Sequence, residues 1–200
     1  MKRYTYLTIL FAIVLAVACK QKTKDAAGND TPEPPDTTEV KAIPAEQLIS
    51  PGQSIGHIKL DGSADSIVQL LGRPDTGDAA MGSQLATWYA DHDTAGYQTS
   101  IFSRRDMGGK DEPVSRIKKI LVTSPWFKTA EYISTGNNLK DIGMYYTLKE
   151  GSSYKKNGQT IKTYTDIEKG ISFEIDMQGK CVGILVHQPN SAADTYLNMH

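Results

Sequence analysis

The chain has 200 residues, with 22 Lys and Arg against 23 Asp and Glu, and a formal net charge of −1. A nucleic-acid-binding protein needs a basic stripe, and this balance provides none, so we expect no nucleic-acid partner. Two cysteines in the whole chain also exclude a disulfide-rich scaffold.

Residues 1–18 have the order of a secretory signal peptide. Lys2 and Arg3 form a short basic region, an apolar run follows from Leu7 to Ala18, and the run ends in small residues. The run is about half of the roughly 20 residues that a membrane-spanning helix needs. We therefore expect export followed by removal of this segment, which leaves 20 basic residues against 23 acidic ones and a net charge of −3.

The residue after this segment predicts a membrane anchor. The stretch "LAVAC", which ends at Cys19, resembles a bacterial lipobox, whose cysteine thiol receives diacylglycerol and becomes the first residue of the mature protein. The resemblance implies a cell-envelope protein that is held in the membrane by lipid on Cys19. Lys20 resembles the residue that directs lipoproteins to the outer membrane in enteric bacteria. Ala16-Val17-Ala18 also fits ordinary signal cleavage, which would leave Cys19 as a free thiol.

Residues 19–48 are predicted to form a disordered tether. They contain Pro32, Pro34, Pro35 and Pro44 and very few aliphatic residues. Such a segment buries too little apolar surface to offset its ordering entropy. Its lysines precede its acidic residues, which places the cations nearest to anionic lipid headgroups. The tether would hold the folded part about 30 Å from the bilayer.

Two similar stretches, residues 58–72 and 133–146, each lead from an isoleucine through a polar turn into a short helical pattern. Ser63 and Asn138 are the expected N-caps. The expected apolar stripes are Ile67, Leu70 and Leu71 in the first stretch and Ile142, Tyr145 and Tyr146 in the second. Sequence identity alone offers a rival alignment of residue 49 with residue 133. We prefer the first alignment because it continues through the strands.

Alternating apolar and polar residues predict three strands after each helical stretch. They cover residues 84–90, 97–103 and 116–124 in the first half, and 160–166, 171–177 and 181–187 in the second. We therefore expect an α+β fold of two tandem modules, each with a short helix packed on an antiparallel sheet of three to four strands. The modules would be residues 49–126 and 127–189, and residues 190–200 would form a tail.

Turn sequences in the second half indicate which residues share a face. Asn157-Gly158 predicts a type I′ hairpin. A two-residue loop at Gln178-Gly179 would place six apolar residues on the core face, in the pairs Ile175 with Val182, Phe173 with Ile184 and Ile171 with Val186. The other face would meet solvent or a partner. The candidate interaction face consists of Glu174, Asp176, Cys181, Leu185 and His187.

Two tandem modules of this kind resemble the β-lactamase inhibitor protein fold. The phrase "GSADSIVQLLGRPD" is similar to the helix of the SmpA/OmlA assembly lipoproteins. The resemblance covers about residues 49–186 and implies a curved sheet of about eight strands, or slightly fewer, that offers one broad face to another protein. The inhibitors carry a disulfide in each module, which this chain cannot form, and the second helix lacks the "LG-x-P" ending.

Three motifs could carry chemistry, and each also has a structural interpretation. Residues 91–93, "DHD", could bind a metal or form a polar turn between strands. Residues 107–113, "MGGKDEP", lack the spacing of a phosphate loop and suit a hairpin tip. Cys181 could be a nucleophile beside His187, but six residues along one strand separate them by about 20 Å. We expect no enzyme activity, no catalytic residue, no metal and no cofactor.

Four aromatic residues leave alternatives open. Trp126 and Phe127 could pack the two modules together or form an exposed binding spot. Trp88 and Tyr89 alternate along one strand, so one of them faces the core.

The sequence favours a lipid-anchored, non-enzymatic module that binds another envelope protein through a sheet face or strand loops. The alternative is a ligand-binding or hydrolytic envelope protein with a cleft between the modules. A shallow face without convergent titratable groups would favour the first class, and a deep pocket with a perturbed acid, His or Cys would favour the second.

Overall fold

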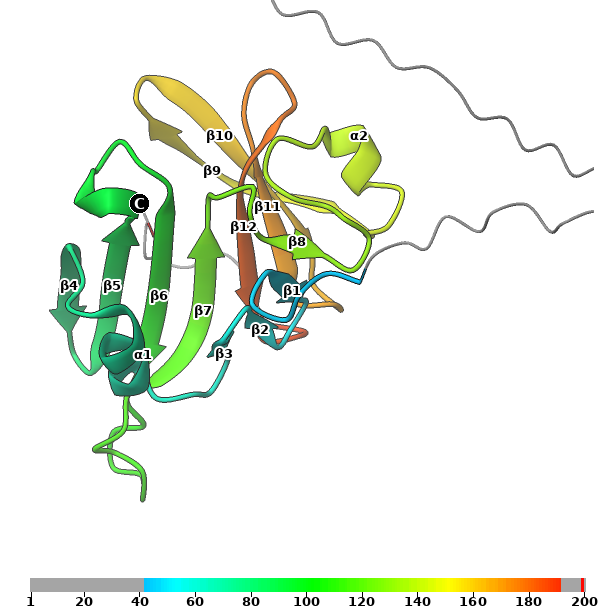
Figure 1. Cartoon of the computed structure of the whole chain (residues 1–200). Coiled ribbons are helices and arrows are strands. Elements are labelled where there is room, and N and C mark those ends of the chain that lie inside the picture. The colour runs from blue at the N-terminus through cyan, green and yellow to red at the C-terminus, as the bar shows by residue number, and fades with distance from the viewer. Residues whose placement is uncertain (1–41, 192–198, 200) are drawn as a thin grey trace, which may run out of the picture. The chain divides into compact units, whose positions relative to one another are not determined.

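Eight antiparallel strands form the main sheet of this computed structural model (Figure 1), which describes residues 42–191 and 199. The strand order is β4-β5-β6-β7-β12-β11-β10-β9. The strands are β4 (Thr76–Ala80), β5 (Ser83–Tyr89), β6 (Gln98–Arg104), β7 (Arg116–Val122), β9 (Lys149–Lys156), β10 (Gln159–Asp166), β11 (Ile171–Ile175) and β12 (Cys181–His187). The signal peptide, Cys19 and most of the tether lie outside the described residues.

A small sheet and two helices cover one face of the main sheet, the nearer face in Figure 1. The small sheet has the order β3-β2-β1-β8, and β8 runs parallel to β1. Its strands are β1 (Leu48–Ser50), β2 (Ser54–Ile55), β3 (Ile58–Lys59) and β8 (Lys128–Thr129), and the helices are α1 (Ala64–Leu71) and α2 (Leu139–Ile142). A short 3₁₀ turn, η1 (Ala90–His92), follows β5. Within the described ranges, no helix has the length and apolar character needed to cross a membrane.

The predicted α+β fold of two tandem modules is wrong. The structure is mainly β, because α1 has only eight residues and α2 only four. The two halves of the chain do not form separate sheets, since β7 pairs with β12 and Leu121 lies opposite Leu185. The small sheet also joins the halves through the pairing of β1 with β8. The described residues accordingly belong to one compact unit.

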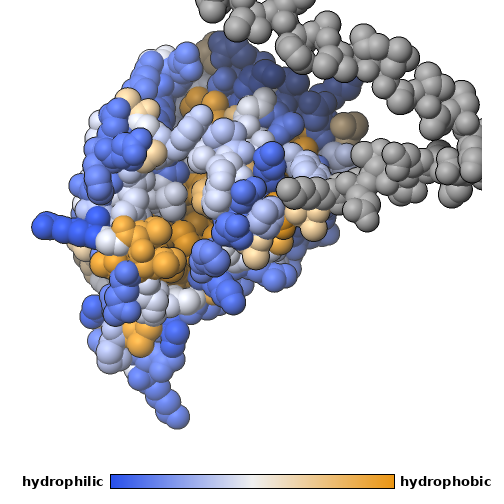
Figure 2. Space-filling view, in the orientation of Figure 1, coloured by the Kyte–Doolittle hydropathy of each residue, from blue (hydrophilic) through white to orange (hydrophobic). Residues whose placement is uncertain are grey.

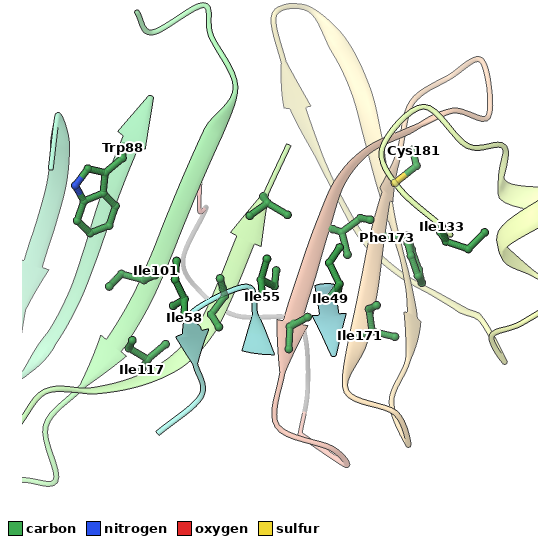
Figure 3. Packing of buried hydrophobic residues seen from close by; sticks show 14 of the residues in the cluster. Ile49, Ile55, Ile58, Trp88, Ile101, Ile117, Ile133, Ile171, Phe173 and Cys181 are labelled. Atoms are coloured by element: carbon green, nitrogen blue, oxygen red, sulfur yellow. The ribbon is translucent and has the colours of Figure 1, made fainter. Parts of the chain in front are cut away.

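The hydrophobic core lies between the main sheet and the small sheet (Figure 3). Its buried residues include Ile49, Ile55 and Ile58 from the small sheet and Ile101, Ile117, Ile171 and Phe173 from the main sheet. Each such side chain contributes about 1.5–3 kcal/mol when it leaves water. Tyr146, which follows α2, packs on Phe173 with the ring centroids 5.0 Å apart.

The stripe predicted for α1 is only partly buried. Ile67 lies in the core, whereas Leu70 and Leu71 are exposed. The helix ends directly after them at Gly72, whose φ of 81° lies in the left-handed region that glycine tolerates. Figure 2 shows the resulting apolar area over α1. In α2 and the turn that follows, Tyr145 is exposed in the same way.

The Asn157-Gly158 hairpin and two of the three predicted core pairs are confirmed, whereas the two-residue loop predicted at Gln178-Gly179 is wrong, because Asp176 lies opposite Lys180. Asn157 and Gly158 both have positive φ, as a type I′ turn requires. Phe173 pairs with Ile184 and Ile171 with Val186 on the core side. Ile175, however, pairs with Cys181 and not with Val182, because a bulge interrupts the register.

Candidate functional site

The second face of the main sheet is turned away from the hydrophobic core, and we call it the polar face. One row across it contains Thr87, Ser100, Leu121, Leu185, Ser172 and Thr165. The hydroxyl groups of Thr87 and Ser100 are hydrogen-bonded at 2.8 Å, and those of Thr165 and Ser172 at 2.8 Å. Neighbouring strands therefore satisfy each other's polar side chains on this face.

This face was expected to meet solvent or a partner, and it is not open to solvent, because Glu174, Leu185 and His187 all lie on it and are buried. A contact with a partner stays a prediction. The sheet curls around the polar face. Lys156 on β9 donates a hydrogen bond to Oε1 of Gln98 on β6 at 3.3 Å, although four strands stand between β6 and β9. A flat sheet would separate these two strands by about 24 Å.

Asp176 and Cys181, the other two predicted interaction residues, do not belong to the polar face. Asp176 lies in the β11–β12 turn, where its carboxylate accepts hydrogen bonds from the backbone N–H groups of Gln178 and Lys180. The bulge turns Cys181 towards the hydrophobic core, and its thiol donates to the carbonyl of Gly183 at 3.3 Å. Burial raises the pKa of the Cys181 thiol, so it stays protonated at neutral pH.

His187 is held as a neutral imidazole on the polar face. A carbonyl oxygen can only accept, so Nδ1 donates to the Gln188 carbonyl at 2.9 Å, and Nε2 accepts from the Ser172 hydroxyl at 3.2 Å. Burial lowers the pKa of His187, and the charge of Lys119 lowers it further. The structure therefore places His187 and Cys181 on opposite faces and does not bring them together.

A cleft of about 730 Å³ opens beside the polar face. It lies between the connection from β5 to β6 and the β9–β10 hairpin. The residues around it include Tyr89, Tyr97, Gln98, Thr123, Gly136, Tyr154, Lys156, Asn157, Gln159, Ile161 and Glu174. The opening is thus surrounded by aromatic rings, amides and charged groups.

Tyr154, Lys156 and Glu174 converge in this cleft, and Cys181 also lines it. Burial raises the pKa of Tyr154, and a hydrogen bond to the Glu174 carboxylate together with its negative charge raises it further. Burial lowers the pKa of Lys156, and the charge of Glu174 partly offsets this effect. Tyr154 therefore remains a phenol at neutral pH and acts as a hydrogen-bond donor to the carboxylate.

Gln98 connects the cleft with the rest of the polar face. Its Nε2 donates to the Ser100 hydroxyl at 2.7 Å and to the backbone carbonyl of Met199 at 2.6 Å. Met199 packs beside it on Leu121 and Leu185. The cleft is thus continuous with the surface on which Met199 packs.

The structure decides between the alternatives that the sequence left open for four aromatic residues. Trp88 faces the core and donates to the Gly72 carbonyl at 3.0 Å, while Tyr89 faces the cleft. Phe127 packs against the core, and Trp126 is exposed with its ring edge against Phe127 at 4.9 Å between centroids.

The two remaining motifs lie in a turn and a loop, as their structural interpretations predicted. His92 lies in the turn after β5, and its Nδ1 is 2.6 Å from the carboxylate of Asp75. The 107–113 stretch lies in the loop between β6 and β7, where the Gly108 N–H donates to the Glu112 carboxylate at 3.1 Å. Across residues 42–191 and 199, no three His, Cys, Asp or Glu side chains form a group that could hold a metal ion.

The comparisons with known proteins add little. No family model and no curated protein matches the chain. A solved structure, an extracellular protein containing an SCP domain from Bacillus anthracis str. Ames, matches with a TM-score of 0.40 and 12% sequence identity. The match covers 66% of this chain and 44% of that one, so the chain spans less than half of that protein. At this level the likeness indicates neither a shared fold nor a shared function.

Proposed function

We propose that the protein is a lipid-anchored, non-enzymatic interaction module of the cell envelope, and that its cleft holds a segment of another envelope protein. One observation carries this proposal. The amide of Gln98, which lines the cleft, donates to the main-chain carbonyl of Met199. Such an amide can hold a backbone carbonyl of any polypeptide in an extended form, whatever its side chain.

The state of the ionisable groups favours binding over catalysis. The raised pKa values keep the Tyr154 phenol and the Cys181 thiol protonated at neutral pH. A protonated thiol is a poor nucleophile, and Cys181 is buried although it lines the cleft. Glu174 hydrogen-bonds to Tyr154. These groups are suited to recognising donors and acceptors of a bound chain.

A small polar ligand is the second candidate, because the cleft volume falls within the roughly 300–1,000 Å³ of small-molecule sites. Tyr89 and Tyr97 could stack on such a ligand. Native mass spectrometry of the protein isolated from its own envelope distinguishes the two candidates. A bound molecule of defined mass supports the small ligand, and its absence together with capture of a protein supports the interaction module.

The anchor on Cys19 and a place in the outer membrane belong to the same proposal. They rest on the sequence before and after Cys19. The variant Cys19→Ser should move the protein from the detergent phase to the aqueous phase or leave the precursor uncleaved. A wild-type mature protein that partitions into the aqueous phase would remove the anchor from the proposal.

The binding site is tested by paired tyrosine variants. Tyr97 lines the cleft and is 55% exposed, whereas Tyr145 is similarly exposed after α2 and does not line the cleft. Tyr97→Ala should lower co-isolation of the crosslinked partner about tenfold, the effect of one lost aromatic anchor. Tyr145→Ala should not change it. Equal capture by both variants would contradict a partner site in the cleft.

A further inference from the structure

The side chain of Met199 packs in a small apolar cluster on the polar face, which we call the socket. The socket consists of Phe102, Leu121 and Leu185, with Leu85 packed against them. Met199 is only 6% exposed. The other methionines of the described residues, Met81, Met107, Met144 and Met177, are all exposed. Burial of Met199 therefore reflects the socket and not a general property of methionine in this protein.

A hydrogen bond fixes the backbone of the same residue. Lys156 can only donate, so Oε1 of Gln98 faces its ammonium group and Nε2 points the other way. This orientation directs the two N–H groups of the amide to the Ser100 hydroxyl and the Met199 carbonyl. One residue is thus held at two points, by its side chain and by its carbonyl.

We propose that the socket and Gln98 form a peptide-binding site for a long, unbranched apolar side chain together with the carbonyl of the same residue. Met199 is its intramolecular occupant. The socket residues do not line the cleft described above. The displacement of Met199 by a partner rests on the proposed function. A partner segment of the same chemistry, with Met or a residue of similar shape, displaces Met199 when it binds.

The intramolecular occupant competes strongly because it is tethered. An occupant that belongs to the same chain has an effective concentration on the order of millimolar. A peptide added from solution therefore binds the wild-type protein weakly, even where its contacts equal those of Met199. Weakening the Met199 contact should open the socket to the added peptide.

The first test measures methionine oxidation in the unaltered full chain. Limited treatment with hydrogen peroxide and peptide mass spectrometry give the rate of sulfoxide formation at each methionine. We expect Met199 to react about tenfold more slowly than Met177, which is 72% exposed. Equal rates at the two positions would overturn the proposal. This test needs no substitution, so it does not depend on how any variant folds.

The second test uses a fluorescent peptide with the sequence of residues 191–200 and the full chain. Anisotropy should show about tenfold tighter binding to the Met199→Ser variant than to the wild type, because the internal competitor is weakened. A peptide with serine in place of its methionine should not bind. Met177→Ser is the matched control and should behave as the wild type. No binding to Met199→Ser, or equal binding to wild type and variant, would contradict the site.

Both tests use the isolated protein, so their outcome is independent of any envelope partner. A socket that fails them also removes the Gln98–Met199 contact as support for the cleft, and the co-isolation experiment then tests the cleft by itself. Conversely, if both socket tests succeed and co-isolation fails, the peptide site remains supported and the envelope partner does not. If both hold, adding the purified partner should raise the oxidation rate of Met199 towards that of Met177.

Discussion

Replacing Phe173 by alanine tests the packing between the main sheet and the small sheet. Phe173 is 0% exposed and its ring lies 5.0 Å from that of Tyr146. Removing a buried phenylalanine ring costs about 3–5 kcal/mol, which includes the lost transfer free energy and the cavity. The loss is a large part of the roughly 5–15 kcal/mol that stabilises a typical domain.

Urea unfolding, followed by the fluorescence of Trp88 and Trp126, gives the measurement. With a slope of about 2 kcal/mol per molar urea, Phe173→Ala should lower the midpoint by about 2 M. The control is Met177→Ala in the exposed turn of the same hairpin, which should change the free energy of unfolding by less than about 0.5 kcal/mol. Similar midpoints for the two variants would show that the core is not where we place it.

Three further predictions concern the other face, the helix and pH. Glu174→Ala should destabilise the fold by about 1–3 kcal/mol in the same urea assay, because the buried Glu174 carboxylate is the acceptor for the half-buried Tyr154 hydroxyl. Leu70→Ser on α1 should change stability by less than about 0.5 kcal/mol, since Leu70 is exposed. His187 has a folded pKa below its ordinary 6.5, so it contributes stability that is complete above pH 6.5 and is lost as the pH falls towards the folded value. Urea midpoints between pH 7 and about 5 should therefore decline in the wild type and less in His187→Gln; parallel declines would contradict the buried neutral imidazole.

Carboxylates with lowered pKa values do not interfere with this test, because they lose their stability contribution below the pH range in which His187 does. The pKa values of Asp75 and Glu131 lie below their ordinary values of 3.8 and 4.5. Backbone and side-chain hydrogen bonds from Tyr89 and His92 lower the first, and hydrogen bonds from Thr129 and Tyr146 outweigh burial in the second. Their stability contributions are complete above those ordinary values and are lost only at lower pH.

Alternating residues predicted six of the eight strands of the main sheet, because each of those strands has one face in the core. Alternation did not predict the two edge strands, and only the Asn157-Gly158 turn indicated a strand at β9. β4 has five exposed residues, "TGDAA", and β9 reads "KEGSSYKK". Neither has a fully buried residue, so their pairing depends mainly on backbone hydrogen bonds to β5 and β10, which leave no periodic signal. The strands of the small sheet have two or three residues and are too short for any period.

The burial of the candidate interaction face was not predicted, because it results from the curl of the sheet. Local alternation correctly put Glu174 and Leu185 on the side opposite Phe173. It could not show that β9 would approach β6 and enclose that side. Gln98 and Lys156 were not predicted as site residues for the same reason, since they are 58 residues apart and carry no motif. The bulge that turns Cys181 to the core also has no sequence signal.

Site-specific crosslinking in the native envelope tests the central claim most directly. A photoreactive residue is placed at position 97, at the cleft, or at position 144, where Met144 is exposed and does not line the cleft. We expect position 97 to give one discrete protein adduct and position 144 to give none. The adduct should be lost in a Glu174→Gln background that retains the wild-type thermal midpoint. Adducts of equal yield from both positions, or none from position 97, would contradict a partner site in the cleft.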